Sequence, residues 1–201
     1  MRHGIAEIWQ YPYVSGVTGK TETCNEHARV AASIESYKVL EANNARALMK
    51  AVAQQPVVVS VDASPWHNYR SGIFDGCDNT KPDINHAVLL VGYGIENGTK
   101  YWTIRNSWGI RFGEDGYIRL KRYDEEPCGT DPNPLMGFAC AADGANQVIK
   151  ACGECGVLAD SSYPTGGRMG GPRPVEEYHP DPRQPDSGGN RRLRSSGVNW
   201  A

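Results

Sequence analysis

The chain of 201 residues lacks any long apolar run, since its longest hydrophobic stretches have the length of a strand. A membrane-spanning helix needs about 20 consecutive apolar residues, so no such span is expected. The N-terminus lacks the apolar core of a secretory signal peptide; this favours the cytosol for a complete protein and carries no meaning for a fragment. A strong net charge is also missing. The formal value of −2 argues against nucleic acid and acidic membranes as partners.

Apolar residues are scarce at the C-terminus, although they make up 39% of the whole chain. The segment 165–201 is instead rich in Gly, Pro, Arg, Asp and Ser. Such a composition cannot bury enough apolar surface to offset the entropy lost on ordering. We therefore expect a folded part over residues 1–164 and a disordered tail over residues 165–201.

The folded part reads as a mixture of one clear helix and several strands. Apolar residues at helical spacing predict a helix over 44–55, which Asn43 or Asn44 can cap and which Pro56 ends. Runs rich in β-branched residues, or alternating apolar and polar residues, predict strands. These runs lie at 57–62, 86–93, 101–106 and 116–122.

Two of these strands end in polar side chains that can act together. His86 opens one apolar run, and Asn106 closes the next. The turn between them holds Asn97-Gly98, a strong hairpin signal. A hairpin can bring His86 and Asn106 together, with Trp108 close enough to cover them. An Asn oxygen that accepts from the ring N–H would orient a histidine that serves as the base for a thiol, and an indole would exclude water.

The segments Asn85–Gly94, Tyr101–Gly109 and Gly113–Leu120, in this order and spacing, resemble the His, Asn and glycine-rich motifs of papain-like cysteine proteases. The resemblance covers about residues 4–122 and 155–164. It implies an α+β fold, in which this chain forms the β-rich right-hand domain with a barrel-like antiparallel sheet. It also implies that His86 is the catalytic base, that Asn106 orients it and that Trp108 shields the pair.

The same resemblance implies peptide-bond hydrolysis with peptide or protein substrates, no metal and no organic cofactor. Cystatin-like inhibitors are candidate partners, and the complete enzyme is expected in a lysosome, in a vacuole or outside the cell. Ser60, Ala87 and Asp160 would line the pocket for the substrate's P2 side chain (the S2 pocket), with Asp160 at its base. The alternative is that an insertion before Cys155 turns Asp160 towards solvent.

The nucleophile of this family is missing from the sequence. No Cys-Gly-x-Cys-Trp segment is present, and the Gln that helps to form the oxyanion hole is absent with it. We therefore expect a fragment that is inactive alone and whose partner is the missing N-terminal papain-like domain. The alternative is a nonenzymatic pseudoprotease that binds peptides or a protease.

Six cysteines remain to be placed. The resemblance pairs Cys77 with Cys155, and pairs Cys24 with a residue of the missing domain. The segment 123–154 reads as an insertion closed by one pair among Cys128, Cys140 and Cys152, and the sequence leaves that pair open. A rival hypothesis is a four-thiolate zinc site, in which the C-x-x-C formed by Cys152 and Cys155 joins Cys128 and Cys140. A thioredoxin-like role is weaker still. We favour disulfides and expect no metal.

The expected hairpin turn also carries a glycosylation sequon. Asn97-Gly98-Thr99 has the Asn-x-Thr pattern on an exposed turn. This makes Asn97 a candidate N-glycosylation site. A glycan there would agree with the secretory or lysosome-like route that disulfides favour.

Overall fold

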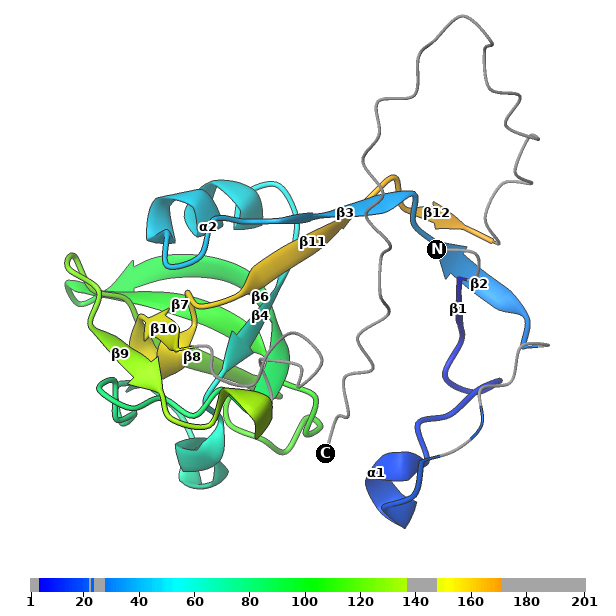
Figure 1. The fold of residues 1–201 in the computed structure, drawn as a ribbon, viewed down its shortest axis with the longest axis horizontal. Coiled ribbons are helices and arrows are strands. Elements are labelled where there is room, and N and C mark those ends of the chain that lie inside the picture. The colour runs from blue at the N-terminus through cyan, green and yellow to red at the C-terminus, as the bar shows by residue number, and fades with distance from the viewer. Residues whose placement is uncertain (1–3, 22, 24–27, 137–147, 171–201) are drawn as a thin grey trace, which may run out of the picture. The chain divides into compact units, whose positions relative to one another are not determined.

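The computed structural model describes residues 4–21, 23, 28–136 and 148–170 (Figure 1). The chain divides into two compact units. One contains the described residues up to Ser36 and from Pro164 onwards, and the other runs from Tyr37 to Tyr163. No helix in these described ranges is both long and apolar enough to cross a membrane.

The smaller unit is a short three-stranded antiparallel sheet. Its elements are β1 (Ile5–Ala6), α1 (Ser15–Thr18), β2 (Val30–Ser33) and β12 (Arg168–Met169), with β2 in the middle of the sheet. The expectation that the disordered tail begins at residue 165 is wrong for its first residues. Backbone pairing of Arg168 with Ser33 and an Arg168–Glu35 ion pair hold β12 in place. These interactions are polar, so a prediction based on the scarcity of apolar residues does not include them. Residues 171–201 lie outside the described residues.

The larger unit is built around one mixed sheet of seven strands in the order β3-β11-β4-β6-β7-β8-β5. Its strands are β3 (Ser36–Val39), β4 (Val57–Val61), β5 (Ile73–Phe74), β6 (His86–Glu96), β7 (Thr99–Arg105), β8 (Tyr117–Lys121) and β11 (Ser161–Thr165). A separate hairpin pairs β9 (Cys128–Asp131) with β10 (Ile149–Cys152). The helical elements are α2 (Ala45–Val52) and the short 3-10 turns η1 (Ser64–Asn68), η2 (Pro134–Met136) and η4 (Glu154–Gly156).

The seven-stranded sheet is open, so the expectation of a barrel-like sheet is wrong. Closure requires the two outermost strands to pair, and these are β3 and β5. All four residues of β3 are exposed, and β5 is only two residues long. One edge strand is thus fully exposed to solvent and the other is too short, so the two do not pair. The described part of the chain is therefore β-rich with few helices and has no closed sheet.

Helix α2 forms where the sequence predicts it. The Asn44 side chain accepts a hydrogen bond from the Ala47 amide at 2.9 Å and caps the first turn. Leu48, Ala51 and Val52 are buried on the face towards the sheet. The helix ends at Val52, three residues before the predicted end, because the chain turns ahead of Pro56.

The β6–β7 hairpin is also confirmed. Its turn has Asn97 at φ 48° and Gly98 at φ 80°, which are both left-handed. This is the pattern of the tight two-residue turn that matches the twist of paired strands. The register places Glu96 opposite Thr99 at the tip, with one irregularity between Leu90 and Gly92.

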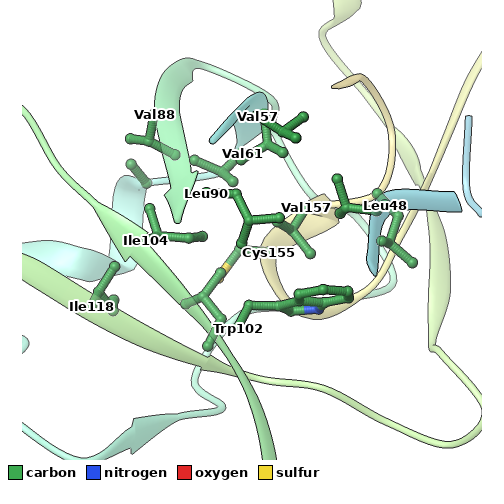
Figure 2. Close-up of a cluster of buried hydrophobic side chains, with 14 of the residues drawn as sticks. Leu48, Val57, Val61, Val88, Leu90, Trp102, Ile104, Ile118, Cys155 and Val157 are labelled. Carbon is green, nitrogen blue, oxygen red and sulfur yellow. The ribbon is translucent and has the colours of Figure 1, made fainter. Parts of the chain in front are cut away.

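The core lies on one face of this sheet (Figure 2). Alternate residues of the central strands point into it and have no or almost no exposed surface, as the two-residue period of a strand requires. They are joined by residues of α2 and of the segment after η4. The core residues labelled in the figure are Leu48, Val57, Val61, Val88, Leu90, Trp102, Ile104, Ile118, Cys155 and Val157. This packing fixes the strand ends from which the candidate site is built.

Candidate functional site

The structure brings His86 and Asn106 into contact. His86 is the first residue of β6 and pairs with Val61 of β4, while Asn106 directly follows β7. The Asn106 N–H donates to the Gly116 carbonyl at 2.9 Å and continues the pairing with the chain before β8. His86 Nε2 then lies 2.9 Å from Asn106 Oδ1. Asn106 is buried and His86 is half-buried.

A second hydrogen bond determines the direction of this contact. The Ser107 N–H donates to Asn106 Oδ1 at 2.7 Å, so this atom must be the carbonyl oxygen of the amide. An oxygen can only accept, and His86 Nε2 must therefore carry the proton that it shares. In the neutral ring Nδ1 then has a free lone pair. The arrangement holds an imidazole in the tautomer whose Nδ1 can act as a base.

Aromatic rings surround this pair. The Trp108 ring lies 5.3 Å from the His86 ring at an interplanar angle of 31°. Trp66 meets His86 edge-on at 6.4 Å, and Phe112 packs edge-on against Trp108 at 5.2 Å. Such rings lower the local dielectric and strengthen the His86–Asn106 hydrogen bond. The sequence identified Trp108, which belongs to the same motif as Asn106, but gave Trp66 no role at the site, because Trp66 lies in neither of the motifs that carry His86 and Asn106.

Ser60, Ala87 and Asp160 also come together. The Ser60 hydroxyl donates to Asp160 Oδ2 at 3.0 Å, and the Ser60 N–H donates to the Asp160 carbonyl at 3.2 Å. Ala87 is the cross-strand partner of Ser60 between β6 and β4. All three side chains are half-buried. The Asp160 carboxylate is therefore directed at Ser60, beside the strand that begins with His86.

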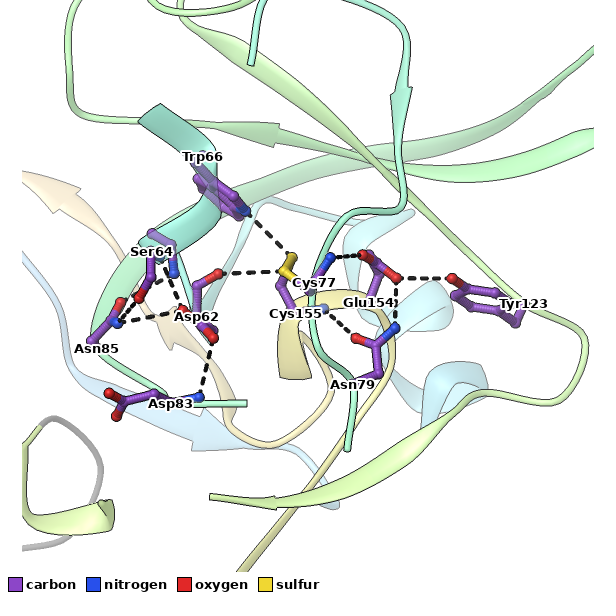
Figure 3. Close-up of a disulfide and its surroundings, with 11 residues drawn as sticks. Asp62, Ser64, Trp66, Cys77, Asn79, Asp83, Asn85, Tyr123, Glu154 and Cys155 are labelled. Atoms are coloured by element: carbon purple, nitrogen blue, oxygen red, sulfur yellow. Dashed lines mark hydrogen bonds between the residues drawn. A yellow bond between two sulfur atoms is a disulfide. The ribbon is translucent and has the colours of Figure 1, made fainter. Parts of the chain in front are cut away.

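Four cysteines form two disulfides, Cys77–Cys155 and Cys128–Cys152 (Figure 3 shows the first). The first is the pair that the resemblance implies. The second closes the β9–β10 hairpin, where Cys128 and Cys152 are cross-strand partners. The zinc hypothesis is wrong, because three of its four cysteines have their sulfur atoms in disulfides. Cys24 and Cys140 lie outside the described residues.

The Cys77–Cys155 disulfide lies beside a buried carboxylate that sequence reasoning missed (Figure 3). Glu154 has no exposed surface, and its oxygens accept 2.8 Å hydrogen bonds from the Cys77 N–H, the Asn79 amide and the Tyr123 hydroxyl. Burial raises the pKa of Tyr123, and the hydrogen bond to Glu154 and its charge raise it further. The donors come from segments 31 to 77 residues away, so no local pattern marks Glu154.

Asn97 is exposed at the tip of the β6–β7 hairpin, and Thr99 of the same sequon is half-buried at the start of β7. The candidate glycosylation site is therefore accessible from solvent.

Comparison with known proteins places this geometry in a family. The model of the papain family of cysteine proteases matches residues 1–138. Cysteine proteinase COT44 of Brassica napus is 39% identical over 163 residues, which are 80% of this chain and 41% of that protein. Zingipain-2 of Zingiber officinale is 43% identical over 129 residues, which are 63% of this chain and 56% of that protein. The KDEL-tailed cysteine endopeptidase CEP2 of Arabidopsis thaliana is 37% identical over 163 residues.

A solved structure agrees with the sequence matches. Bromelain from Ananas comosus, in complex with the E64 inhibitor, is 36% identical and superposes with a TM-score of 0.59. The superposition covers 81% of this chain and 63% of the bromelain chain. The chain spans about 41% of the length of COT44 and 37% of that of CEP2. The match over residues 1–138, the identities and the superposition agree: the chain belongs to the papain family of cysteine proteases.

Proposed function

We propose that this chain supplies the histidine and the asparagine of a papain-like cysteine peptidase, whose thiol comes from a segment outside the given sequence. The observation that carries the proposal is the 2.9 Å contact between His86 Nε2 and Asn106 Oδ1 beneath the Trp108 ring. Family membership supports it. Cys77, Cys128, Cys152 and Cys155 are held in disulfides and cannot supply the thiolate.

The proposed reaction is acyl transfer to a thiolate. His86 Nδ1 takes the proton of the thiol, and the thiolate adds to the scissile carbonyl. The imidazolium returns this proton to the leaving amine as the carbon–nitrogen bond breaks. Water then attacks the thioester, with His86 again as the base. Asn106 keeps the ring in one tautomer throughout and adds no charge of its own.

We also propose that Ser60, Ala87 and Asp160 form the S2 pocket. A half-buried carboxylate is costly to desolvate unless it is paired. Asp160 accepts one hydrogen bond from the Ser60 hydroxyl, and a cationic P2 side chain would satisfy it further. The complete enzyme is therefore expected to accept Arg as well as Leu at P2. Asp160→Ala should lower the Arg/Leu ratio of kcat/KM, and an unchanged ratio would remove Asp160 from the pocket.

The compartment proposed for the complete enzyme is oxidising: a secretory, vacuolar or lysosome-like space, or the cell exterior. Two disulfides support it, because such bonds persist where thiols are not kept reduced. Glycosylation at the exposed Asn97 would fit the same route. Peptides and proteins are the proposed substrates, and cystatin-like proteins are proposed inhibitors.

The test restores the missing thiol. The chain is joined to the cysteine-bearing domain of a relative, and hydrolysis of a fluorogenic dipeptide is measured with and without E-64. His86→Ala should reduce kcat/KM by about 10³-fold or more, since nucleophile and base act as a unit. Asn106→Ala should cost less, and the exposed Asn133→Ala serves as a matched control. A folded joined protein that binds peptides but turns none over would instead identify a nonenzymatic module.

A further inference from the structure

A second histidine, His67, is in contact with Trp108. The His67 ring lies 5.0 Å from the Trp108 ring at an interplanar angle of 10°, which is a stacked arrangement. The His86 ring lies 5.3 Å from the same indole at 31°. The indole is thus in contact with two imidazoles, of which only His86 bonds to Asn106. Nothing in the catalytic proposal uses His67.

The position of His67 follows from the turn that carries it. The 3-10 turn η1 runs from Ser64 to Asn68, with a proline in its first positions. Its neighbour Trp66 is fully buried and donates its indole N–H to Cys155 Sγ at 3.3 Å (Figure 3). Trp66 therefore anchors the turn in the core, and His67 is left exposed on the outside. The His67 ring is held where Trp108 can stack on it.

Trp108 needs such support, because its own backbone gives little. It lies in the loop between β7 and β8, next to Gly109 at φ 86°, and 39% of its surface is exposed. Phe112 touches the indole only by its edge, at 84°, and the angle to Trp66 is 66°. Of the rings placed around Trp108, His67 is the most nearly parallel to it.

We propose that His67 is a positioning residue, which keeps Trp108 over the His86–Asn106 hydrogen bond by stacking of its ring and not by its charge. The proposal rests on the proposed function only for its effect on catalysis. Its effect on the hydrogen bond can be measured on the chain itself.

The experiment follows the His86 Nε2 proton by NMR in the full ¹⁵N-labelled chain. A proton that is hydrogen-bonded and covered by an indole exchanges slowly with water. Loss of one aromatic contact should speed the opening of the His86–Asn106 hydrogen bond, and with it the exchange of this proton, about three- to tenfold. We expect this acceleration in His67→Ala and in His67→Lys, which lack the ring. His67→Phe, which stacks but carries no charge, should remain within about twofold of the native rate. Asn68→Ala, on the same turn, is the matched control.

Two results would overturn the proposal: native-like exchange in His67→Ala, or equally fast exchange in His67→Phe and His67→Ala. The joined peptidase supplies a second readout, in which His67→Ala should lower kcat/KM and His67→Phe should restore it. If the joined native protein proves inactive, the proposed function fails, while the exchange rates still decide whether His67 positions Trp108.

Discussion

Glu126 and Glu154, whose charges interact in the folded structure, differ in how their burial is compensated. Glu154 is fully buried and accepts from three donors, so its charge is well compensated. Glu126 also has both carboxyl oxygens buried, and a backbone hydrogen bond from Tyr123 compensates this burial only in part. Burial raises the pKa of Glu126 to about 7. The backbone hydrogen bond from Tyr123 and the Arg122 charge oppose this rise, and the charges of Glu154 and Asp124 add to it.

Glu126 should therefore make the fold more stable in acid. Its folded-state pKa is about 7 against about 4.5 for an unperturbed side chain, so the folded state binds the proton more tightly. The contribution is complete below pH 4.5 and is lost as the pH rises through 7. For a half-exposed side chain we expect about 1–2 kcal/mol of unfolding free energy. Denaturant titrations at pH 4.5 and pH 7.5 measure it.

The neutral variant Glu126→Gln is the control for this group. The glutamine of this variant cannot ionise. The difference in unfolding free energy between the native chain and the variant should therefore change by about 1–2 kcal/mol between pH 4.5 and pH 7.5. If the difference is the same at both pH values, Glu126 does not titrate in this range.

At the scale of elements, the sequence predicts correctly those features that are determined by residues adjacent in the chain. The β6–β7 turn forms because both of its residues tolerate the left-handed backbone that a tight hairpin requires. Helix α2 forms because Asn44 caps a run of apolar residues at helical spacing. In both elements the residues that decide the structure are adjacent in sequence.

Position 98 requires glycine because of its backbone conformation, and not because a side chain would lack room there. A Cβ added at Gly98 would meet no atom within 4 Å, but its φ of 80° is strained for any other residue. Gly98→Ala should lower the unfolding free energy by about 1 kcal/mol. Gly92→Ala is the matched control, because Gly92 lies on β6 with equally open space and without a positive φ. Denaturant unfolding of both variants is the measurement, and equal effects would refute the backbone argument.

Features that depend on distant residues could not be predicted from the sequence. The motifs located His86, Asn106 and Trp108, and the structure places them in contact. The stacking of His67 and the donors around Glu154 arise only when separate segments pack together. The openness of the sheet depends on its short edge strands. The β2–β12 pairing depends on backbone hydrogen bonds between strands that are far apart in sequence. Neither leaves a pattern in composition or periodicity.

At the scale of the whole molecule, two disulfides tie distant parts of the larger unit. Cys77 and Cys155 are 78 residues apart, and Cys128 and Cys152, 24 apart, lie inside that loop. Chain entropy alone gives about 4.5 kcal/mol for the outer loop and about 3.5 kcal/mol for the inner one. Such a small difference cannot rank them. Each disulfide has one buried member, Cys155 or Cys152, so the comparison depends on the other member. Cys77 of the outer pair is half-buried, whereas Cys128 of the inner pair is exposed. Cys155 also accepts a hydrogen bond from the Trp66 N–H.

The outer disulfide should therefore matter more to stability and resist reduction longer. The double variant Cys77→Ala/Cys155→Ala loses buried contacts as well as the cross-link, so its Tm should fall further than that of Cys128→Ala/Cys152→Ala. A thiol reductant can approach the exposed Cys128 in the folded chain, whereas the outer pair offers it only the half-buried Cys77 and the fully buried Cys155. Alkylation during a reductant titration, read peptide by peptide, should label Cys128 and Cys152 first. Labelling of Cys77 and Cys155 at the same or a lower reductant concentration would show that the outer disulfide is not protected by the core.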